Sequence, residues 1–250
     1  MTFIRPPLQE IFFGLKGIEK MTKCGWTLEQ VAKTIDHALL RPDMTREEVS
    51  AGCALAKKYG VASVCCKPCD IRQCASELQG SDVLVGTVVG FPHGNSATAV
   101  KVFETQQAVK DGAVEIDLVI NIGWLRSGAV KEVEEEVRAV VEAACGNDVK
   151  VILENAYLTN EQKVECCKLV ERAGAHYVKT STGFASTGAT LEDIELMVNA
   201  VRDLPRKVKV KSAGGVKSLD QLLSYMNAGV SRSGCSATAA VLDEFKQRFC

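Results

Sequence analysis

The sequence predicts a closed (β/α)8 TIM barrel, in which eight parallel strands lie inside a ring of helices. Short β-branched segments alternate eight times with amphipathic segments along the chain. The length of 250 residues is typical of one barrel domain. An open doubly wound sheet is the alternative, but a dinucleotide-binding sheet of that kind normally carries a G-x-G-x-x-G turn after its first strand, and this sequence has none.

The predicted strands are short runs rich in Val, Ile and Thr, each followed by a turn or a polar segment. In chain order they are Thr34–His37, Ala62–Cys66, Val83–Val89, Glu115–Asn121, Lys150–Asn155, Tyr177–Thr182, Lys207–Ala213 and Ser231–Ser236.

The predicted helices fill most of the intervals between these strands. The first begins at a capping box, Thr45-Arg46-Glu47-Glu48. The others are Ala97–Asp111, Val130–Ala144, Thr159–Ala173, Thr190–Val201, Ser218–Ala228 and Ala237–Phe249. Residues 1–30 are predicted to be a partly helical N-terminal extension, so that 31–250 form a single barrel domain.

Composition excludes several classes of function. A net charge of -1 provides no electrostatic basis for binding nucleic acid or an anionic membrane. The longest apolar runs are far shorter than the ~18 residues that a membrane span needs. The eleven cysteines are odd in number and lie mostly in apolar periodic segments. They predict reduced thiols and a cytoplasmic location.

A metal site is not expected from the sequence. The pair Cys66 and Cys69 forms one C-x-x-C, but the second pair that a structural zinc site needs is missing. The histidines and carboxylates show no metal-ligand spacing either. The prediction is therefore that the protein needs no metal and no cofactor.

Ionisable side chains occupy the strand face that should point into the barrel. In 115–121, Ile116 and Leu118 suit the helix layer, so alternation turns Asp117 inward. The same alternation turns inward Asp36, Cys65, Lys179, Lys209 and Lys211. Charges at the C-terminal ends of barrel strands are typical of a catalytic site. Interior ion pairs without chemistry are the alternative, but they are an energetically costly way to fill a core.

Several motifs make the chain similar to one enzyme family. They are Ile35-Asp36-His37, Gly90-Phe91-Pro92-His93-Gly94, Glu115-Ile116-Asp117-Leu118-Val119-Ile120-Asn121, Val178-Lys179-Thr180-Ser181-Thr182-Gly183-Phe184 and Lys211-Ser212-Ala213-Gly214-Gly215-Val216. In this order and spacing, from about residue 31 to residue 241, they resemble the signature segments of the deoxyribose-phosphate aldolases.

The resemblance implies a reversible aldol cleavage of 2-deoxyribose 5-phosphate through a lysine Schiff base. Lys179 matches the nucleophile of the family, and Lys211 matches a second lysine whose charge lowers the pKa of the first. Asp117 matches the acid that moves protons. The implied substrate-binding residues are Asp36, Cys65, Thr87, Thr180, Gly183, Gly214, Gly215, Val216, Gly234 and Ser236, with the glycines approaching the phosphate.

The sequence departs from the family pattern at four positions, which are Ala38, Asn155, Lys209 and Ala237. Lys209 lies two residues before Lys211, so alternation places it inward and one layer deeper. A lysine buried there needs a partner. Glu154 is the predicted partner, and replacing Lys209 by glycine is then expected to lower stability.

Two other functions stay open at this point. The chain could be a Schiff-base aldolase with a different acceptor, or a catalytically weak relative that acts as a binding or scaffold protein. The presence together of Lys179, Lys211 and Asp117 argues against the scaffold. The expected partner is a small sugar phosphate, and the resemblance implies a homo-oligomer such as a dimer.

Overall fold

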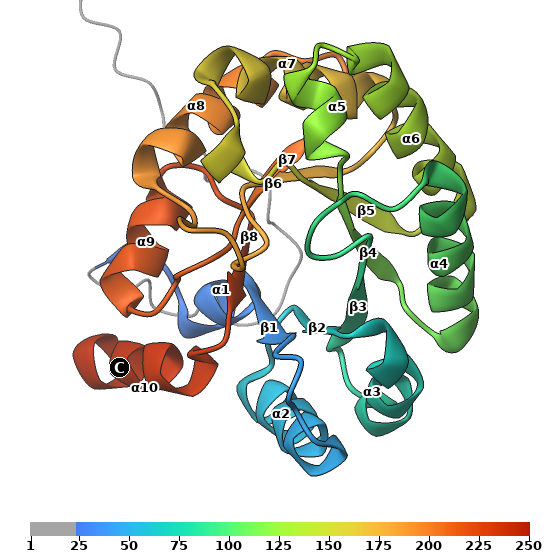
Figure 1. Cartoon of the computed structure of the whole chain (residues 1–250). Coiled ribbons are helices and arrows are strands. Elements are labelled where there is room, and N and C mark those ends of the chain that lie inside the picture. The colour runs from blue at the N-terminus through green and yellow to red at the C-terminus, as the bar shows by residue number, and fades with distance from the viewer. Residues whose placement is uncertain (1–23) are drawn as a thin grey trace, which may run out of the picture.

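The computed structural model of the protein describes residues 24–250, which form a closed barrel of parallel strands in the order β1 to β8 (Figure 1). The predicted fold class is confirmed, and every predicted strand overlaps an observed one. The strands are β1 (Ile35–Leu39), β2 (Ser63–Cys66), β3 (Leu84–Val89), β4 (Glu115–Val119), β5 (Asp148–Ile152), β6 (Tyr177–Lys179), β7 (Lys209–Ser212) and β8 (Arg232–Cys235).

Helices surround the barrel on its outer side (Figure 1). They are α1 (Leu28–Ala32), α2 (Arg46–Tyr59), α3 (Ile71–Leu78), α4 (Thr98–Asp111), α5 (Ile122–Arg126), α6 (Val130–Ala143), α7 (Asn160–Arg172), α8 (Leu191–Arg202), α9 (Leu219–Asn227) and α10 (Thr238–Phe249). Single 3-10 turns occur at Pro68–Asp70 and Asn155–Tyr157. Helices α3 and α5 are not among the predicted helices.

Capping side chains fix where several helices begin. At α2 the Thr45 hydroxyl accepts from the amide of Glu48, and the Glu48 carboxylate accepts from the amide of Thr45, which is the predicted capping box. Thr159 and Gln162 form the same reciprocal pair at α7. These bonds satisfy amides that have no partner inside the helix.

The hydrophobic core lies between the barrel and the helices. Ile116, Leu118 and Val151 on the outer strand face are fully buried there. Free thiols of Cys53 and Cys166 fill the same layer as small apolar groups. The apolar layer is therefore a ring around the barrel, which leaves the inner strand face available for polar side chains.

The start of the described chain packs against its end. Helix α1 contacts α10, and Val31 and Ala32 are buried in the core. The predicted boundary between residues 30 and 31 therefore passes through α1. The rest of the predicted N-terminal extension, up to residue 23, lies outside the described residues.

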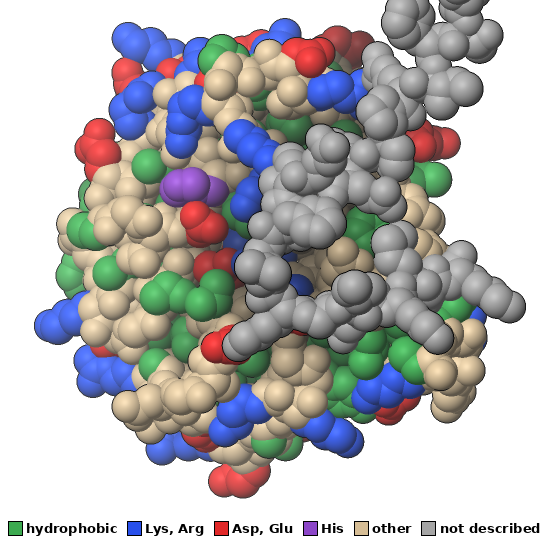
Figure 2. All heavy atoms as spheres, turned by 180° about the vertical axis from the view of Figure 1, so that it is seen from behind, with side chains coloured by type: hydrophobic (Ala, Val, Ile, Leu, Met, Phe, Trp, Pro, Cys, Tyr) green, Lys and Arg blue, Asp and Glu red, His purple; other side chains and the backbone are tan. Residues whose placement is uncertain are grey.

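The surface carries charges of both signs. On the face shown in Figure 2, Lys and Arg side chains are interspersed with Asp and Glu. Within residues 24–250, no helix is both long enough and apolar enough to span a bilayer.

The turn after β3 provides a test of the fold. Gly94 has φ +68°, and a Cβ atom there would lie 1.9 Å from the carbonyl oxygen of Ile120. We expect Gly94→Ala to lower the free energy of unfolding by about 3 kcal/mol or more, because left-handed strain and a backbone clash add. Gly80 is the control: it has φ +76° with nothing within 4 Å of the added atom. Gly80→Ala is expected to cost about 1–2 kcal/mol in the same denaturant titration. Equal losses in the two variants would contradict the close packing of Gly94 against Ile120.

Candidate active site

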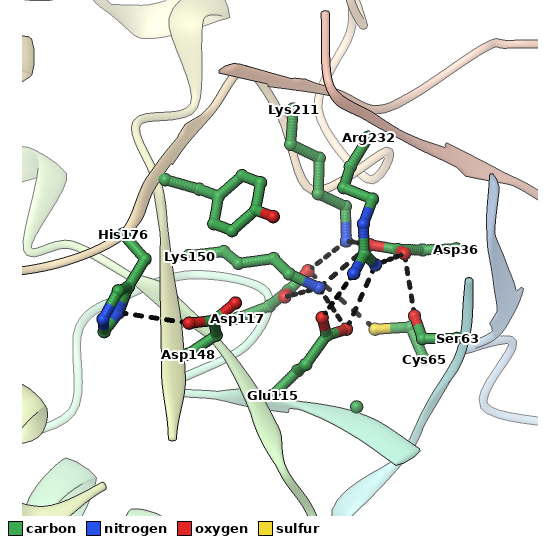
Figure 3. Close-up of polar contacts among 12 residues, drawn as sticks. Asp36, Ser63, Cys65, Glu115, Asp117, Asp148, Lys150, His176, Lys211 and Arg232 are labelled. Carbon is green, nitrogen blue, oxygen red and sulfur yellow. Dashed lines mark hydrogen bonds and ion pairs between the residues drawn. The ribbon is translucent and has the colours of Figure 1, made fainter. Parts of the chain in front are cut away.

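Charged side chains from six strands fill the middle of the barrel. Figure 3 labels all of them except Lys179. We call them the interior charged group: Asp36, Glu115, Asp117, Lys150, Lys179, Lys211 and Arg232. Six of them are no more than 2% exposed, and the Arg232 side chain is 13% exposed. Since an unpaired charge in such a place would be very costly, each member of the group needs a partner of opposite charge.

One carboxylate oxygen accepts from both lysines near the top of the group. Asp117 Oδ2 lies 2.6 Å from Lys179 Nζ and 2.7 Å from Lys211 Nζ. In the strand register Lys179 is the partner of Lys211. Because the barrel is closed, the Asp117 side chain of β4 reaches both lysines across its interior. The other oxygen, Asp117 Oδ1, is buried without a hydrogen-bond partner and is 3.7 Å from Lys150 Nζ.

Asp36 is the second carboxylate that contacts Lys211. Its Oδ2 lies 2.6 Å from Lys211 Nζ and 3.0 Å from Lys150 Nζ. Its Oδ1 accepts from the Ser63 hydroxyl at 2.8 Å and from the Arg232 guanidinium. Lys211 is therefore held between two carboxylates, Asp36 and Asp117.

Glu115 completes the group lower in the barrel. Its carboxylate lies 2.5 Å from Lys150 Nζ and 2.8 Å from Arg232 Nη2. The neighbouring strand has Gly86 beside it, and a Cβ there would sit 3.4 Å from the Cβ of Glu115. The small residue leaves space for the charged layer.

The pKa values distinguish Lys179 from its neighbours. Burial lowers the pKa of Lys179, and Lys211 lowers it further, against the opposing effect of Asp117. Burial also acts on Lys211 and Lys150, but nearby carboxylates outweigh it and raise both pKa values. Burial disfavours the charged form of Asp117, but Lys179 and Lys211 hold its pKa below the usual range. Lys179 is thus the cation of this group that loses its proton most easily.

A small cavity opens directly above these groups. It has a volume of about 50 Å³ and is lined by Asp36, Ala38, Leu40, Cys65, Lys179, Thr182, Lys211, Ala213, Gly214 and Gly234. Burial raises the pKa of the Cys65 thiol to about 11. Cys65 therefore lines the cavity as a neutral thiol.

The predicted substrate-binding residues fall into three sets. Asp36, Cys65, Gly214 and Gly234 line the cavity. Gly183, Gly215 and Ser236 are exposed on its rim side, in the loops after β6, β7 and β8. The third set, Thr87, Thr180 and Val216, does not face the cavity.

The side chains of this third set have other partners. Thr87 pairs in register with Ile116 of the outer strand face, and its hydroxyl donates to the Cys66 carbonyl. The Thr180 hydroxyl donates to the carbonyl of Ala213 and accepts from its amide. Val216 is buried in the hydrophobic core. Strand alternation and backbone pairing turn these three side chains away from the cavity. A contact of these residues with substrate stays a prediction.

The predicted pair of Lys209 with Glu154 was also wrong. Lys209 is the first residue of β7 and is exposed, with its ammonium 3.3 Å from the Tyr177 hydroxyl and 5.1 Å from the centre of that ring. Glu154 follows the end of β5 and bonds to Thr182. The two residues lie at opposite ends of parallel strands, so alternation placed Lys209 on the correct face but at the wrong depth.

Lys150, Glu115 and Arg232 are not among the side chains predicted to point inward. Each lies two residues before an inward position, namely Ile152, Asp117 and Gly234. Extending the alternation by one step toward the start of each strand would have found them.

The other departures from the family pattern have different surroundings. Ala38 lines the cavity. Asn155 is buried, with its amide nitrogen 3.3 Å from Met197 Sδ. Ala237 precedes α10 without a side-chain capping bond.

A larger depression of about 360 Å³ lies on the outside of the barrel, where it is lined partly by His93, Phe91 and Phe103. It contains no member of the interior charged group. His93, in the loop after β3, lines this outer depression and not the small cavity.

The chain is similar over most of its length to known aldolases. The family model described as DeoC/LacD family aldolase matches residues 30–242. A deoxyribose-phosphate aldolase of Staphylococcus epidermidis is 48% identical over 211 residues, which cover 84% of this chain and 94% of that protein.

Solved structures agree with the sequence comparison. A putative deoxyribose-phosphate aldolase from Coccidioides immitis superposes with a TM-score of 0.86 at 37% identity, over 88% of this chain and 87% of that one. A deoxyribose phosphate aldolase from Aeropyrum pernix, described as having a unique tetrameric structure, gives a TM-score of 0.82 at 30% identity, over 88% and 92% of the two chains.

The two lysines Lys150 and Lys209 provide a paired test of the site. We expect Lys150→Met to lower the free energy of unfolding by about 3–5 kcal/mol, because Asp36 and Glu115 lose a buried counter-charge. Lys209→Ala removes an exposed side chain and is expected to cost less than about 1 kcal/mol. Denaturant titration of both variants measures the difference. A loss at Lys209 as large as that at Lys150 would mean that Lys209 is part of the interior network.

Proposed function

The chain belongs to the DeoC/LacD family of aldolases, and from that premise we propose that it cleaves 2-deoxy-D-ribose 5-phosphate to acetaldehyde and D-glyceraldehyde 3-phosphate. The reaction is reversible and serves the breakdown of deoxyribonucleosides. In this proposal Lys179 is the Schiff-base nucleophile, Asp117 moves protons and Lys211 adjusts the pKa of Lys179.

The observation that carries the proposal is the state of Lys179. A lysine must lose its proton before it can attack a carbonyl carbon. Lys179 lines the cavity, and it is the cation of the interior charged group with a lowered pKa. Its Nζ lies 2.6 Å from a carboxylate that can take up and return protons.

The proposed reaction begins at C1 of the open-chain sugar. The neutral amine of Lys179 adds to the aldehyde, and loss of water with uptake of one proton gives an iminium ion. The C3 hydroxyl then loses its proton while the C2–C3 bond breaks, so that the bonding electrons move into an enamine on Lys179. Protonation at C2 and hydrolysis release acetaldehyde and restore the amine.

Asp117 is suited to the proton transfers of this sequence. One of its oxygens is held by both lysines, while the buried Oδ1 has no hydrogen-bond partner. A buried acceptor of that kind can bind a water or a substrate hydroxyl. Protons can then pass between Asp117 and the reacting atoms without a large movement of side chains.

The phosphate of the substrate is proposed to bind at the rim. A sugar phosphate is longer than the small cavity, so its C5 end would extend toward the loops that carry Gly183, Gly214, Gly215, Gly234 and Ser236. Close backbone packing supports this placement: a Cβ on Gly188 would lie 2.1 Å from the carbonyl oxygen of Gly214. Backbone amides in a glycine-rich rim can approach phosphate oxygens closely.

Two further features belong to the proposal. Buried free thiols such as Cys53 and Cys166 fit a reducing compartment, which supports a cytoplasmic location. We also propose a homo-oligomer, in line with the tetramer described for the Aeropyrum pernix neighbour.

Reductive trapping tests the nucleophile. We expect borohydride, added to the protein with acetaldehyde or deoxyribose 5-phosphate, to fix a single adduct on Lys179, because only a neutral amine forms the imine. Peptide mass spectrometry locates the adduct, and Lys179→Leu should abolish it. An adduct on Lys150 or Lys211 would contradict the assignment. A folded protein that reacts with neither compound would favour a binding or scaffold function, and turnover of other sugar phosphates alone would indicate a different acceptor.

Replacement of Lys211 tests the electrostatic part of the proposal. Lys211 lowers the pKa of Lys179, so Lys211→Leu should raise that pKa. The neutral amine then appears at higher pH, and the midpoint of the trapping rate against pH should move up by about one unit or more. Lys211→Arg retains the positive charge and should leave the midpoint near that of the unchanged protein. Equal midpoints in all three proteins would show that Lys211 does not adjust Lys179.

A further inference from the structure

Glu154 has a backbone conformation that side-chain-bearing residues rarely adopt. It follows β5 with φ +55° and ψ +67°, in the left-handed region. Within residues 24–250, Cys145 is the one other non-glycine residue with positive φ. Such a conformation costs free energy and persists only where the surroundings hold it. Its position beside the Lys179 strand makes the contacts of Glu154 important.

The backbone on both sides of Glu154 is tied to the strand that carries Lys179. The amide of Leu153 donates to the carbonyl of Lys179, and the amide of Asn155 donates to the carbonyl of Thr180, both at 2.9 Å. The left-handed turn lies between these two bonds. Glu154 is therefore fixed relative to the nucleophile by the chain on either side of it.

The carboxylate of Glu154 holds the loop after Lys179. It is 2% exposed and accepts from the amide of Thr182 at 3.2 and 3.3 Å, and also from the Thr182 hydroxyl. The Thr182 hydroxyl in turn accepts from the amide of Phe184 at 3.0 Å. Burial raises the pKa of Glu154, while the bonds from Thr182 and the charge of Lys179 act in the opposite direction.

This loop forms part of the wall of the cavity and continues to the rim. Thr182 lines the cavity together with Lys179 and Lys211. Two residues later, the Phe184 ring packs edge-on against Phe91 from the loop after β3, with ring centres 5.3 Å apart. One carboxylate thus orders a segment that leads from the nucleophile to an aromatic contact between two loops.

We propose that Glu154 is a positioning residue that sets the Thr182–Phe184 loop for the phosphate-bearing part of the substrate. This inference rests on the proposed function. The reacting aldehyde lies at Lys179, whereas the phosphate is at the far end of the sugar, near this loop. Loss of Glu154 should therefore impair the binding of the sugar phosphate much more than the attack of Lys179 on a small aldehyde.

Replacement by glycine isolates the side chain, because glycine adopts positive φ without strain. We expect Glu154→Gly to raise KM for deoxyribose 5-phosphate by about tenfold or more. The rate of acetaldehyde trapping on Lys179 should stay within about threefold, and the thermal midpoint should change by only a few degrees. Cys145→Gly is the matched control, since Cys145 is exposed and lies between α6 and β5. It should leave KM and trapping unchanged.

Variants of Thr182 test whether the effect passes through the loop. Thr182→Val removes the hydroxyl that bonds to both Glu154 and Phe184, so it should also raise KM. Thr182→Ser keeps a hydroxyl at this position and should leave KM near that of the unchanged protein. The double variant Glu154→Gly with Thr182→Val should be little worse than the poorer single variant, because both break one link. If the increase in KM of the double variant equals the product of the two single increases, Glu154 and Thr182 act independently and the proposal is overturned.

Amide hydrogen exchange measures how well the Thr182–Phe184 loop is ordered when no substrate is present. In the ligand-free protein, the amides of Thr182 and Phe184 should exchange faster in Glu154→Gly and at the unchanged rate in Cys145→Gly. Unchanged exchange together with an unchanged KM would overturn the inference, even in an active aldolase. A trapping rate that falls as much as KM rises would also overturn it, because Glu154 would then act on Lys179 itself. Faster exchange in a protein that does not cleave deoxyribose 5-phosphate would refute the proposed function and leave the structural role of Glu154 intact.

Discussion

The interaction on which the rest of the site depends is the oxygen of Asp117 shared by two ammonium groups. Lys179 and Lys211 stand opposite each other on neighbouring strands, and their charges repel. They can lie together inside the barrel because Asp117 Oδ2 accepts from both, at 2.6 and 2.7 Å. Asp36 holds Lys211 from the other side. This arrangement keeps one lysine firmly charged and leaves the other with a weaker hold on its proton.

A charged interior changes how the barrel is stabilised. Barrel interiors are usually packed with branched apolar side chains. Here much of that volume belongs to ion pairs, so the apolar core lies between the strands and the helices. Breaking a buried pair costs far more than forming it gains, because the remaining partner is left as an uncompensated charge. The intact network therefore adds little net stability, whereas the loss of any one member is costly.

The alternation of strands with helices predicted the fold. The alternation of side chains along each strand predicted which residues face inward, but it could not give their depth along the barrel axis. It placed Lys209 inward, yet closure of the barrel leaves the first residue of β7 in an exposed position, far from Glu154. One further step of alternation would have turned Lys150 and Arg232 inward, but it could not have given their ion pairs, which join strands distant in sequence. The left-handed turn at Glu154 has no sequence signal, since glycine or asparagine would be the usual residue there.

The composition of the interior charged group has a further consequence for its electroneutrality. Fully ionised, the group contains four cations and three carboxylates, a surplus of one positive charge. In a medium with little water, release of a single proton restores parity, and Lys179 is the member whose pKa is lowered. In the proposed reaction, formation of the iminium ion brings the surplus charge back. That charge is then in place when the C2–C3 bond breaks, and the iminium ion that carries it receives the bonding electrons as the enamine forms.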